Sequence, residues 1–249
     1  MAALRTSDLV RVFCRSLVLQ ASWSFQGMQA LGFAYAMEPA LRRLYGGGEA
    51  YRRGVSRHLK FFNTHPFLAA AVLGGAVRVE AEGGDGADEG VRRLKNGLMG
   101  PLGAVGDCFY WGALKPLLVL AALHLACRGV LWAPAAFVAT FGACNLAGRG
   151  YAFVQGYRRG SGVADFLSCW GLLRWARRCQ FLAALLLGAL LAAAYGPDFL
   201  DGWAVPVVAG AGAALTLALG TGWVLARGVR LSWLLWAAAI LCWGVVAWT

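Results

Sequence analysis

The 249-residue chain is 59% hydrophobic and only 14% charged, and it contains 34 glycines and 11 tryptophans. Soluble domains carry about 25% charged residues, whereas Trp and Gly are both frequent in membrane-spanning chains. The composition therefore argues against a soluble globular protein and indicates a polytopic membrane protein. The formal net charge of +11 comes from basic residues clustered between apolar segments, and no nucleic-acid-reading motif accompanies them, so we expect no nucleic-acid partner.

The N-terminal quarter of the chain is basic and only partly apolar. Within it, the stretch "SLVLQASWSFQGMQALGFAYAMEPAL" places Gln20, Trp23, Gln26 and Gln29 at three-residue steps. Such spacing predicts an amphipathic helix of several turns with a polar stripe. Because basic residues outnumber acidic ones here, we expect this region to lie on, or dip into, the cytoplasmic face of the lipid bilayer.

Two segments separate this region from the more apolar part of the chain. After Pro66 comes an apolar run shorter than the ~20 residues needed to cross a bilayer, which predicts a re-entrant or half-membrane segment. Residues 78–95 are rich in glycine and acidic residues, and this composition predicts a solvated, flexible loop.

From residue 97 onward the sequence is typical of transmembrane helices. A cytoplasmic N-terminus followed by about five crossings leaves every basic connection on the cytoplasmic side, as the positive-inside rule requires. We therefore predict an all-α inner-membrane protein with a periplasmic C-terminus. It would form a single unit over 1–249, with an amphipathic and re-entrant region at 1–96 and a transmembrane bundle at 97–249. The expected crossings lie near 97–127, 130–147, 180–196, 203–226 and 231–248.

The stretch "GLMGPLGAVGDCFYWGALKP" is largely apolar, yet it contains Asp107 and Lys115. Glycines at three-residue steps would give its helix a bare edge that another backbone can approach. Pro101 removes a helix hydrogen bond, so we expect the helix to start or break there. Backbone bends are assigned to Gly100, Pro101, Gly106 and Pro116.

Asp107 has two interpretations. Ionisable groups within membrane segments are costly and usually face a cavity, which favours a carboxylate that accepts hydrogen bonds from the hydroxyl groups of a solute. Alternatively, Asp107 caps a broken helix or pairs with a nearby base. Asn63 and His65 lie directly before Pro66. They either contribute to a transport site at a broken membrane helix or, together with Thr64, cap the segment that begins at Pro66.

Catalytic and metal-binding patterns are not found in the sequence. It contains no GxSxG, Walker A, HExxH or GxGxxG pattern, and none of its seven cysteines belongs to a CxxC pair. We therefore expect no autonomous catalysis, no metal site and no cofactor.

Three blocks, "LQASWSFQGMQALGFAYAMEPAL", "HLKFFNTHPF" and "NGLMGPLGAVGDCFYWGALKP", closely resemble the IID subunit of mannose-family sugar phosphotransferase systems. The resemblance implies that the chain pairs with a IIC membrane subunit, that such pairs assemble into a higher oligomer, and that the complex is a hexose permease. It also implies that soluble IIA and IIB proteins carry the phosphoryl group on their histidines. The sugar would be phosphorylated as it reaches the cytoplasm.

The first hypothesis is therefore a IID-type permease subunit. Its sugar path is assigned to Asp107, Asn63, His65 and Gln29, with Trp23 as either an aromatic face for a sugar ring or an interface anchor. A second hypothesis is a non-transporting scaffold or regulatory protein that keeps the IIC contact, because "SWSFQGMQ" replaces a block that usually reads closer to "SWNFERMQ". A third is an unrelated channel.

Overall fold

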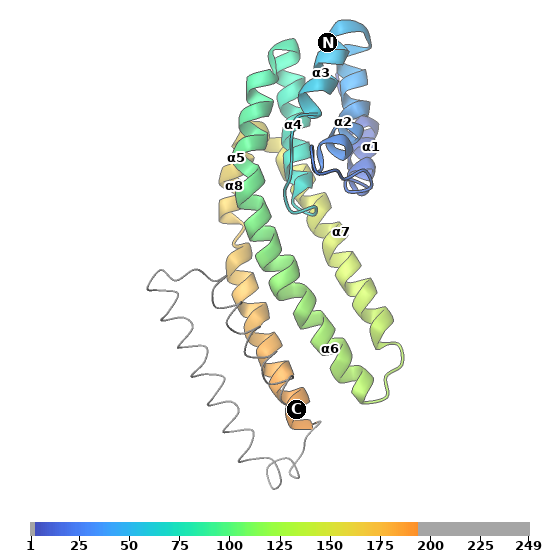
Figure 1. Ribbon diagram of the computed structural model, residues 1–249, viewed down its shortest axis with the longest axis vertical. Helices are drawn as coiled ribbons and strands as arrows, with labels where there is room; N and C mark the ends of the chain where they lie inside the picture. Colours follow the sequence, from blue (N-terminus) through green and yellow to red (C-terminus); the bar gives the residue numbers. More distant parts are fainter. Residues whose placement is uncertain (1–2, 194–249) are drawn as a thin grey trace, which may run out of the picture. The chain divides into compact units, whose positions relative to one another are not determined.

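The computed structural model describes residues 3–193 as a set of packed α-helices (Figure 1). The chain divides into two compact units, residues 1–189 and 190–249, and the packing described below belongs to the first. Its described residues contain no β-strand, only two isolated bridges, so the all-helical prediction is confirmed for this part of the chain. The crossings expected near 203–226 and 231–248 lie outside the described residues. The single unit and the count of about five crossings stay predictions.

The helical elements follow one another with short connections. The N-terminal helices are α1 (Thr6–Ser16), α2 (Ala30–Tyr45) and α3 (Gly48–His58). The central elements are α4 (Ala69–Gly83), the 3₁₀ turn η1 (Gly84–Gly86), α5 (Asp88–Gly106), the π-helix η2 (Asp107–Leu114) and α6 (Lys115–Cys127). The later elements are α7 (Ala133–Arg159), the 3₁₀ turn η3 (Gly160–Gly162), α8 (Val163–Cys169) and the helix Leu172–Ala193.

The amphipathic helix predicted within residues 16–41 is present only in part: residues 17–29 form turns between α1 and α2, and residues 30–41 belong to α2. Met28 has a left-handed φ of 53°, and its backbone forms bridges with Ser24 and with Phe62. The backbone here pairs with a distant part of the chain. These tertiary hydrogen bonds replace the local helical ones that the three-residue periodicity predicts.

The packing of α4 against α7 depends on glycines. A Cβ atom on Gly74 would lie 2.2 Å from the Phe153 carbonyl oxygen. A Cβ atom on Gly156 would lie 2.1 Å from the Ala71 carbonyl oxygen. Only glycine permits so short a separation between two helix backbones, as in the small-residue helix pairs of membrane proteins. Residues 69–77 of α4 are all buried, and the predicted re-entrant position of this helix in a bilayer stays a prediction.

The long flexible loop predicted over residues 78–95 is also wrong. α4 continues to the end of its glycine-rich tail, and one 3₁₀ turn connects it to α5. Gly84 supplies the turn with a φ of +55°, which a side chain would strain. Ion pairs between residues one helical turn apart, such as Arg78 with Glu82 at 2.6 Å, line the exposed faces. Charged residues in this segment therefore support two helices.

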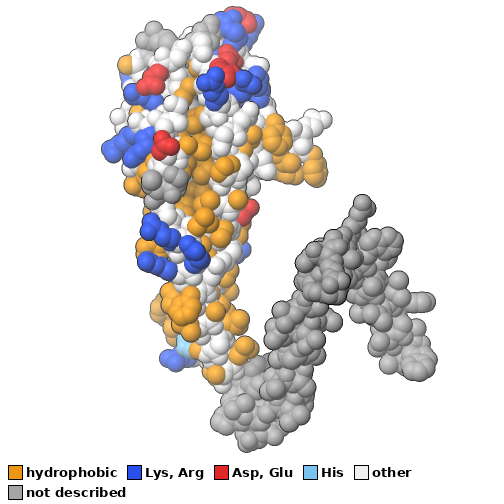
Figure 2. Space-filling model, turned by 90° about the vertical axis from the view of Figure 1, so that its left-hand side faces the viewer, with side chains coloured by type: hydrophobic (Ala, Val, Ile, Leu, Met, Phe, Trp, Pro, Cys, Tyr) orange, Lys and Arg blue, Asp and Glu red, His pale blue; other side chains and the backbone are white. Residues whose placement is uncertain are grey.

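Two of the described helices are long and apolar enough to cross a membrane. Asp88–Cys127 runs through α5, η2 and α6 for 40 residues, and Leu172–Ala193 is 22 residues long. On the face shown in Figure 2, acidic side chains lie mostly toward one end of the described unit, a group of Lys and Arg side chains lies about midway, and hydrophobic side chains are spread over much of the surface. The break or start of a helix predicted at Pro101 is wrong. Pro101 lies inside α5, which continues on both sides of it.

The irregular part of the long helix is η2, which Gly106 precedes and Pro116 follows. Pro116 has no N–H group, so the carbonyl oxygen of Gly112 lacks the donor that an α-helix would supply four residues later. The side-chain amide of Gln180 donates to that oxygen at 3.2 Å. Pro116 therefore removes a backbone donor where the α-helical pattern is interrupted, and Gln180 from another helix supplies a replacement donor.

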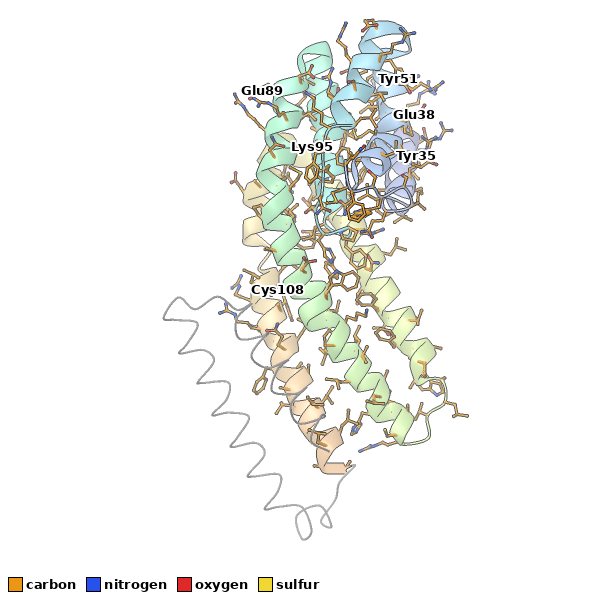
Figure 3. All side chains as sticks on the ribbon, in the orientation of Figure 1. Tyr35, Glu38, Tyr51, Glu89, Lys95 and Cys108 are labelled. Atoms are coloured by element: carbon orange, nitrogen blue, oxygen red, sulfur yellow. The ribbon has the colours of Figure 1, made fainter. Side chains whose placement is uncertain are left out.

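A buried cluster of ionisable groups joins α2, α3, α4 and α5, with Lys95 on α5 (Figure 3). The Glu80 carboxylate lies 2.5 Å from the Tyr45 hydroxyl and 2.8 Å from His58 Nε2. Arg57 lies 3.6 Å from the same carboxylate, and Lys95 Nζ donates to the His58 carbonyl oxygen at 3.2 Å. The hydrophobic pattern of the sequence gives no sign of this cluster, because its members are spread over four helices.

Burial of His58 makes the stability of the fold depend on pH. Burial lowers the pKa of this imidazole below its usual 6.5, although the Glu80 carboxylate acts in the opposite direction. As the pH falls below about 6.5, the unfolded chain takes up a proton that the folded chain does not, so folding loses stability. We expect the melting temperature in detergent to fall between about pH 6.5 and pH 5. The fall should be less steep in His58→Gln, which keeps a donor for Glu80; equal slopes would contradict this assignment.

Candidate functional site

A cavity of about 440 Å³ lies where the connection between α3 and α4 meets α5 and η2. Cys108, labelled in Figure 3, is at this level of the long helix. Trp23 does not line the cavity: it is 44% exposed and packs edge-on against Phe25. The other four residues predicted for a solute path do line it, namely Gln29, Asn63, His65 and Asp107.

Gln29 holds one wall of the cavity in place. Its amide nitrogen donates to the Thr64 carbonyl oxygen at 2.7 Å, and its amide oxygen accepts from the Thr64 N–H at 3.2 Å. The Thr64 hydroxyl in turn donates to the Met99 carbonyl oxygen at 2.9 Å. The side-chain amide of Gln29 thus forms with the Thr64 backbone the same two hydrogen bonds that a residue of a neighbouring β-strand would form. Its polar atoms are already engaged, so its contribution is to position the connection.

His65 is buried against the long helix because Gly106 has no side chain. A Cβ atom on Gly106 would lie 2.3 Å from the His65 Cβ and Cγ atoms. The imidazole stacks on the Tyr110 ring at 5.0 Å, and its Nδ1 accepts from the Phe67 N–H at 3.3 Å. That bond assigns the proton of the neutral ring to Nε2. Burial lowers the pKa of His65 to about 4, so the ring is neutral at physiological pH.

The Nε2 atom of His65 is buried and has no hydrogen-bond partner among the described residues. Asp107 and Asn63 are both exposed residues on the cavity wall. Neither side chain forms an ion pair or hydrogen bond within residues 3–193. Lys115, two helical turns beyond Asp107, lies over the Trp111 ring at 5.3 Å. The described part of the chain therefore supplies no base that neutralises Asp107.

Trp111 supplies the aromatic surface of the cavity that was expected from Trp23. It lines the cavity, is 40% exposed, and packs 5.3 Å from the His65 ring. The sequence contained a usable signal, because Trp111 follows Asp107 by four residues and shares its helix face.

Arg149 is a functional candidate that sequence reasoning missed. The crossing expected near 130–147 left it in a loop, whereas α7 continues past it and buries it. Its guanidinium donates to the Pro66 carbonyl oxygen at 3.3 Å and lies 4.7 Å from the Phe67 ring centre. Arg149 thus fixes the end of the connection that carries His65, one residue beyond His65, whereas Gln29 holds Thr64, the residue before it.

The groups around the cavity suit a neutral solute with many hydroxyl groups. A carboxylate accepts hydrogen bonds, the Nε2–H group of His65 donates one, and the Asn63 amide can do both. The Trp111 ring can cover an apolar face of such a solute. Within the described residues, no group of three His, Cys, Asp or Glu side chains could hold a metal ion.

A polar cavity beside an irregular part of a membrane-length helix defines a class of protein, the membrane permease subunit. Residues 3–196 match the family model described as the PTS system mannose/fructose/sorbose family IID component. The chain therefore belongs to the IID component family of the mannose/fructose/sorbose phosphotransferase system (PTS).

Characterised relatives show the same membership. The PTS system mannose-specific EIID component of Escherichia coli K12 is 38% identical over 192 residues, covering 76% of this chain and 68% of the relative. The fructose permease IID component of Bacillus subtilis strain 168 is 33% identical, covering 76% and 70%. The sorbose-specific EIID component of Klebsiella pneumoniae is 34% identical, covering 74% and 68%.

Solved structures agree with this membership. A cryo-EM structure of the mannose transporter ManYZ in complex with microcin E492 contains a chain that is 31% identical, with a TM-score of 0.62 and coverage of 99% of this chain and 98% of the other. A second structure, described as a membrane protein, is 32% identical with a TM-score of 0.72, covering 98% and 97%.

Proposed function

We propose that this IID component forms, with a IIC partner, a permease that carries a mannose-type hexose across the bacterial inner membrane. The single observation that carries the proposal is the cavity that brings Asn63, His65 and Asp107 together beside η2. The mannose, fructose and sorbose specificities of its relatives support a hexose as the substrate class.

In this proposal the cavity residues have separate roles. The Asp107 carboxylate accepts hydrogen bonds from sugar hydroxyls, and the Asn63 amide and His65 Nε2–H complete the polar contacts. Trp111 packs against the apolar face of the sugar ring. Gln29 and Arg149 hold the connection between α3 and α4 in the geometry that these contacts need.

The remaining features of the complex follow from the family. Soluble IIA and IIB proteins would supply the phosphoryl group, so this chain would bind and translocate the sugar without catalysing the transfer itself. IIC–IID pairs would assemble into a higher oligomer. The N-terminus would be cytoplasmic and the C-terminus periplasmic, which agrees with the basic connections of the sequence.

Uptake by an Asp107→Asn variant tests the proposal. A charge-assisted hydrogen bond to a hydroxyl contributes about 1.5–3 kcal/mol, so the variant should lower apparent hexose affinity about 10- to 100-fold. Radiolabelled hexose uptake and phosphorylation would be measured in cells that contain the IIA, IIB and IIC partners. Glu49→Gln, an exposed carboxylate on α3, is the matched control and should transport normally. Normal affinity in Asp107→Asn, with an intact complex, would remove Asp107 from the sugar site.

A further inference from the structure

A second, larger hollow lies between α1 and α2, which pack along each other (Figure 1). It is an open groove of about 910 Å³, and it shares no lining residue with the cavity beside η2. Its charged lining consists of five arginines, Arg5, Arg11, Arg15, Arg42 and Arg43, and of two carboxylates, Asp8 and Glu38. The groove therefore has an excess of positive charge that nothing in the proposed sugar path uses.

The two carboxylates hold some of these arginines in place. Glu38, labelled in Figure 3, pairs with Arg15 at 2.7 Å and with Arg42 at 2.6 Å. Asp8 lies 3.9 Å from Arg43, whose Nε also donates to a backbone carbonyl oxygen at 3.2 Å. Shared carboxylates fix the guanidinium groups without neutralising all of them. The N–H donors of a planar guanidinium group held in this way match the oxygens of a phosphate group.

Arg11, like Arg5, differs from the three arginines that Glu38 and Asp8 hold. It is exposed, and its side chain forms no ion pair or hydrogen bond within the described residues. An arginine that lines a positively charged groove without a partner is available to an anion from outside the chain.

An exposed apolar edge lies beside the arginines on α1. Val10 in α1 is 53% exposed, and Leu17, the residue directly after α1, is 41% exposed; they are seven residues, or about two helical turns, apart. Arg11 and Arg15 lie on the adjacent edge, four residues apart. A helix surface with basic residues next to exposed aliphatic ones is typical of helices that lie in a membrane interface. An acidic soluble protein would need the charges but not this aliphatic edge.

We propose that the groove between α1 and α2 binds the phosphate headgroups of anionic phospholipids, with Val10 and Leu17 in contact with the acyl chains. Basic residues are attracted to an anionic leaflet, so the groove would hold this part of the protein against the membrane surface. This inference is independent of the sugar site.

Lipid-dependent thermal stability of the full chain, purified with its IIC partner in detergent, tests the proposal. Phosphatidylglycerol should raise the melting temperature by several degrees more than phosphatidylcholine does. Arg11→Gln should reduce that difference by about half, and the Arg11→Gln, Arg43→Gln double variant should abolish it. Arg52→Gln, an exposed arginine on α3, should keep the full difference.

A separate measurement distinguishes loss of lipid binding from loss of folding. The melting temperature of each variant in phosphatidylcholine reports whether it folds, and Arg11→Gln removes no ion pair or hydrogen bond within the described residues. An equal response to both lipids, or an undiminished phosphatidylglycerol response in the double variant, would overturn the proposal. Binding of a soluble acidic polypeptide that depends on Arg11, without any phosphatidylglycerol response, would assign the groove to an acidic protein and would likewise overturn it.

Discussion

Replacement of Gly106 by valine is expected to abolish hexose uptake. A Cβ atom at this position would lie 2.3 Å from two atoms of His65, and real side chains do not approach so closely. Because His65 is buried and stacks on Tyr110, the clash must displace the connection between α3 and α4 or unwind η2. Either movement separates His65 and Asn63 from Asp107.

Hexose uptake in cells with the partner proteins would measure this effect. Gly97→Val is the matched control, since a Cβ atom on Gly97, in the same helix, has no atom within 4 Å in the described residues. Co-purification with the IIC partner would show that both variants still assemble. Uptake near the wild-type rate in Gly106→Val would show that the position of His65 does not matter to transport.

Replacement of Glu80 by glutamine is expected to cause the largest loss of stability. The carboxylate is fully buried, and it contacts Tyr45, His58 and Arg57. Removing one partner of a buried charge pair typically costs about 3–5 kcal/mol, because the remaining charge is left without compensation. For a chain of this size the melting temperature should fall by about 10 °C.

Thermal melting in detergent would test the Glu80 prediction. The control is Glu82→Gln on the same helix, where the side chain is 59% exposed and, within residues 3–193, pairs only with Arg78 at the surface. A surface ion pair contributes little to stability, so this control should melt within about 4 °C of the wild type. A similar melting temperature for both variants would show that the buried cluster does not stabilise the fold.

The sequence indicated the site through polar residues placed next to broken apolar patterns. Asn63 and His65 precede a proline, and Asp107 interrupts an apolar run. Each therefore departs from the regular, apolar helix that is typical of a membrane segment. The structure brings these three residues to one cavity. Nothing in local spacing could show that the two segments meet, because the contact depends on the close approach of His65 to Gly106.

The misplaced predictions have a common physical cause. Periodicity predicted a helix through Trp23, but the backbone near Met28 pairs with Phe62 and the chain turns instead. Arg149 looked like a cytoplasmic loop residue, yet its guanidinium satisfies the Pro66 carbonyl oxygen inside the fold. In both cases a long-range hydrogen bond outweighs the local pattern, and a single sequence contains no record of such bonds.

The most direct test of the account is a cryo-EM reconstruction of the chain with its IIC partner and a bound hexose. We expect sugar density in the cavity beside η2, with hydroxyl oxygens about 2.5–3.0 Å from the Asp107 carboxylate. It also predicts that the Trp111 ring faces the sugar. Sugar density held wholly by the IIC subunit, with this cavity closed or filled by a IIC side chain, would contradict the central claim.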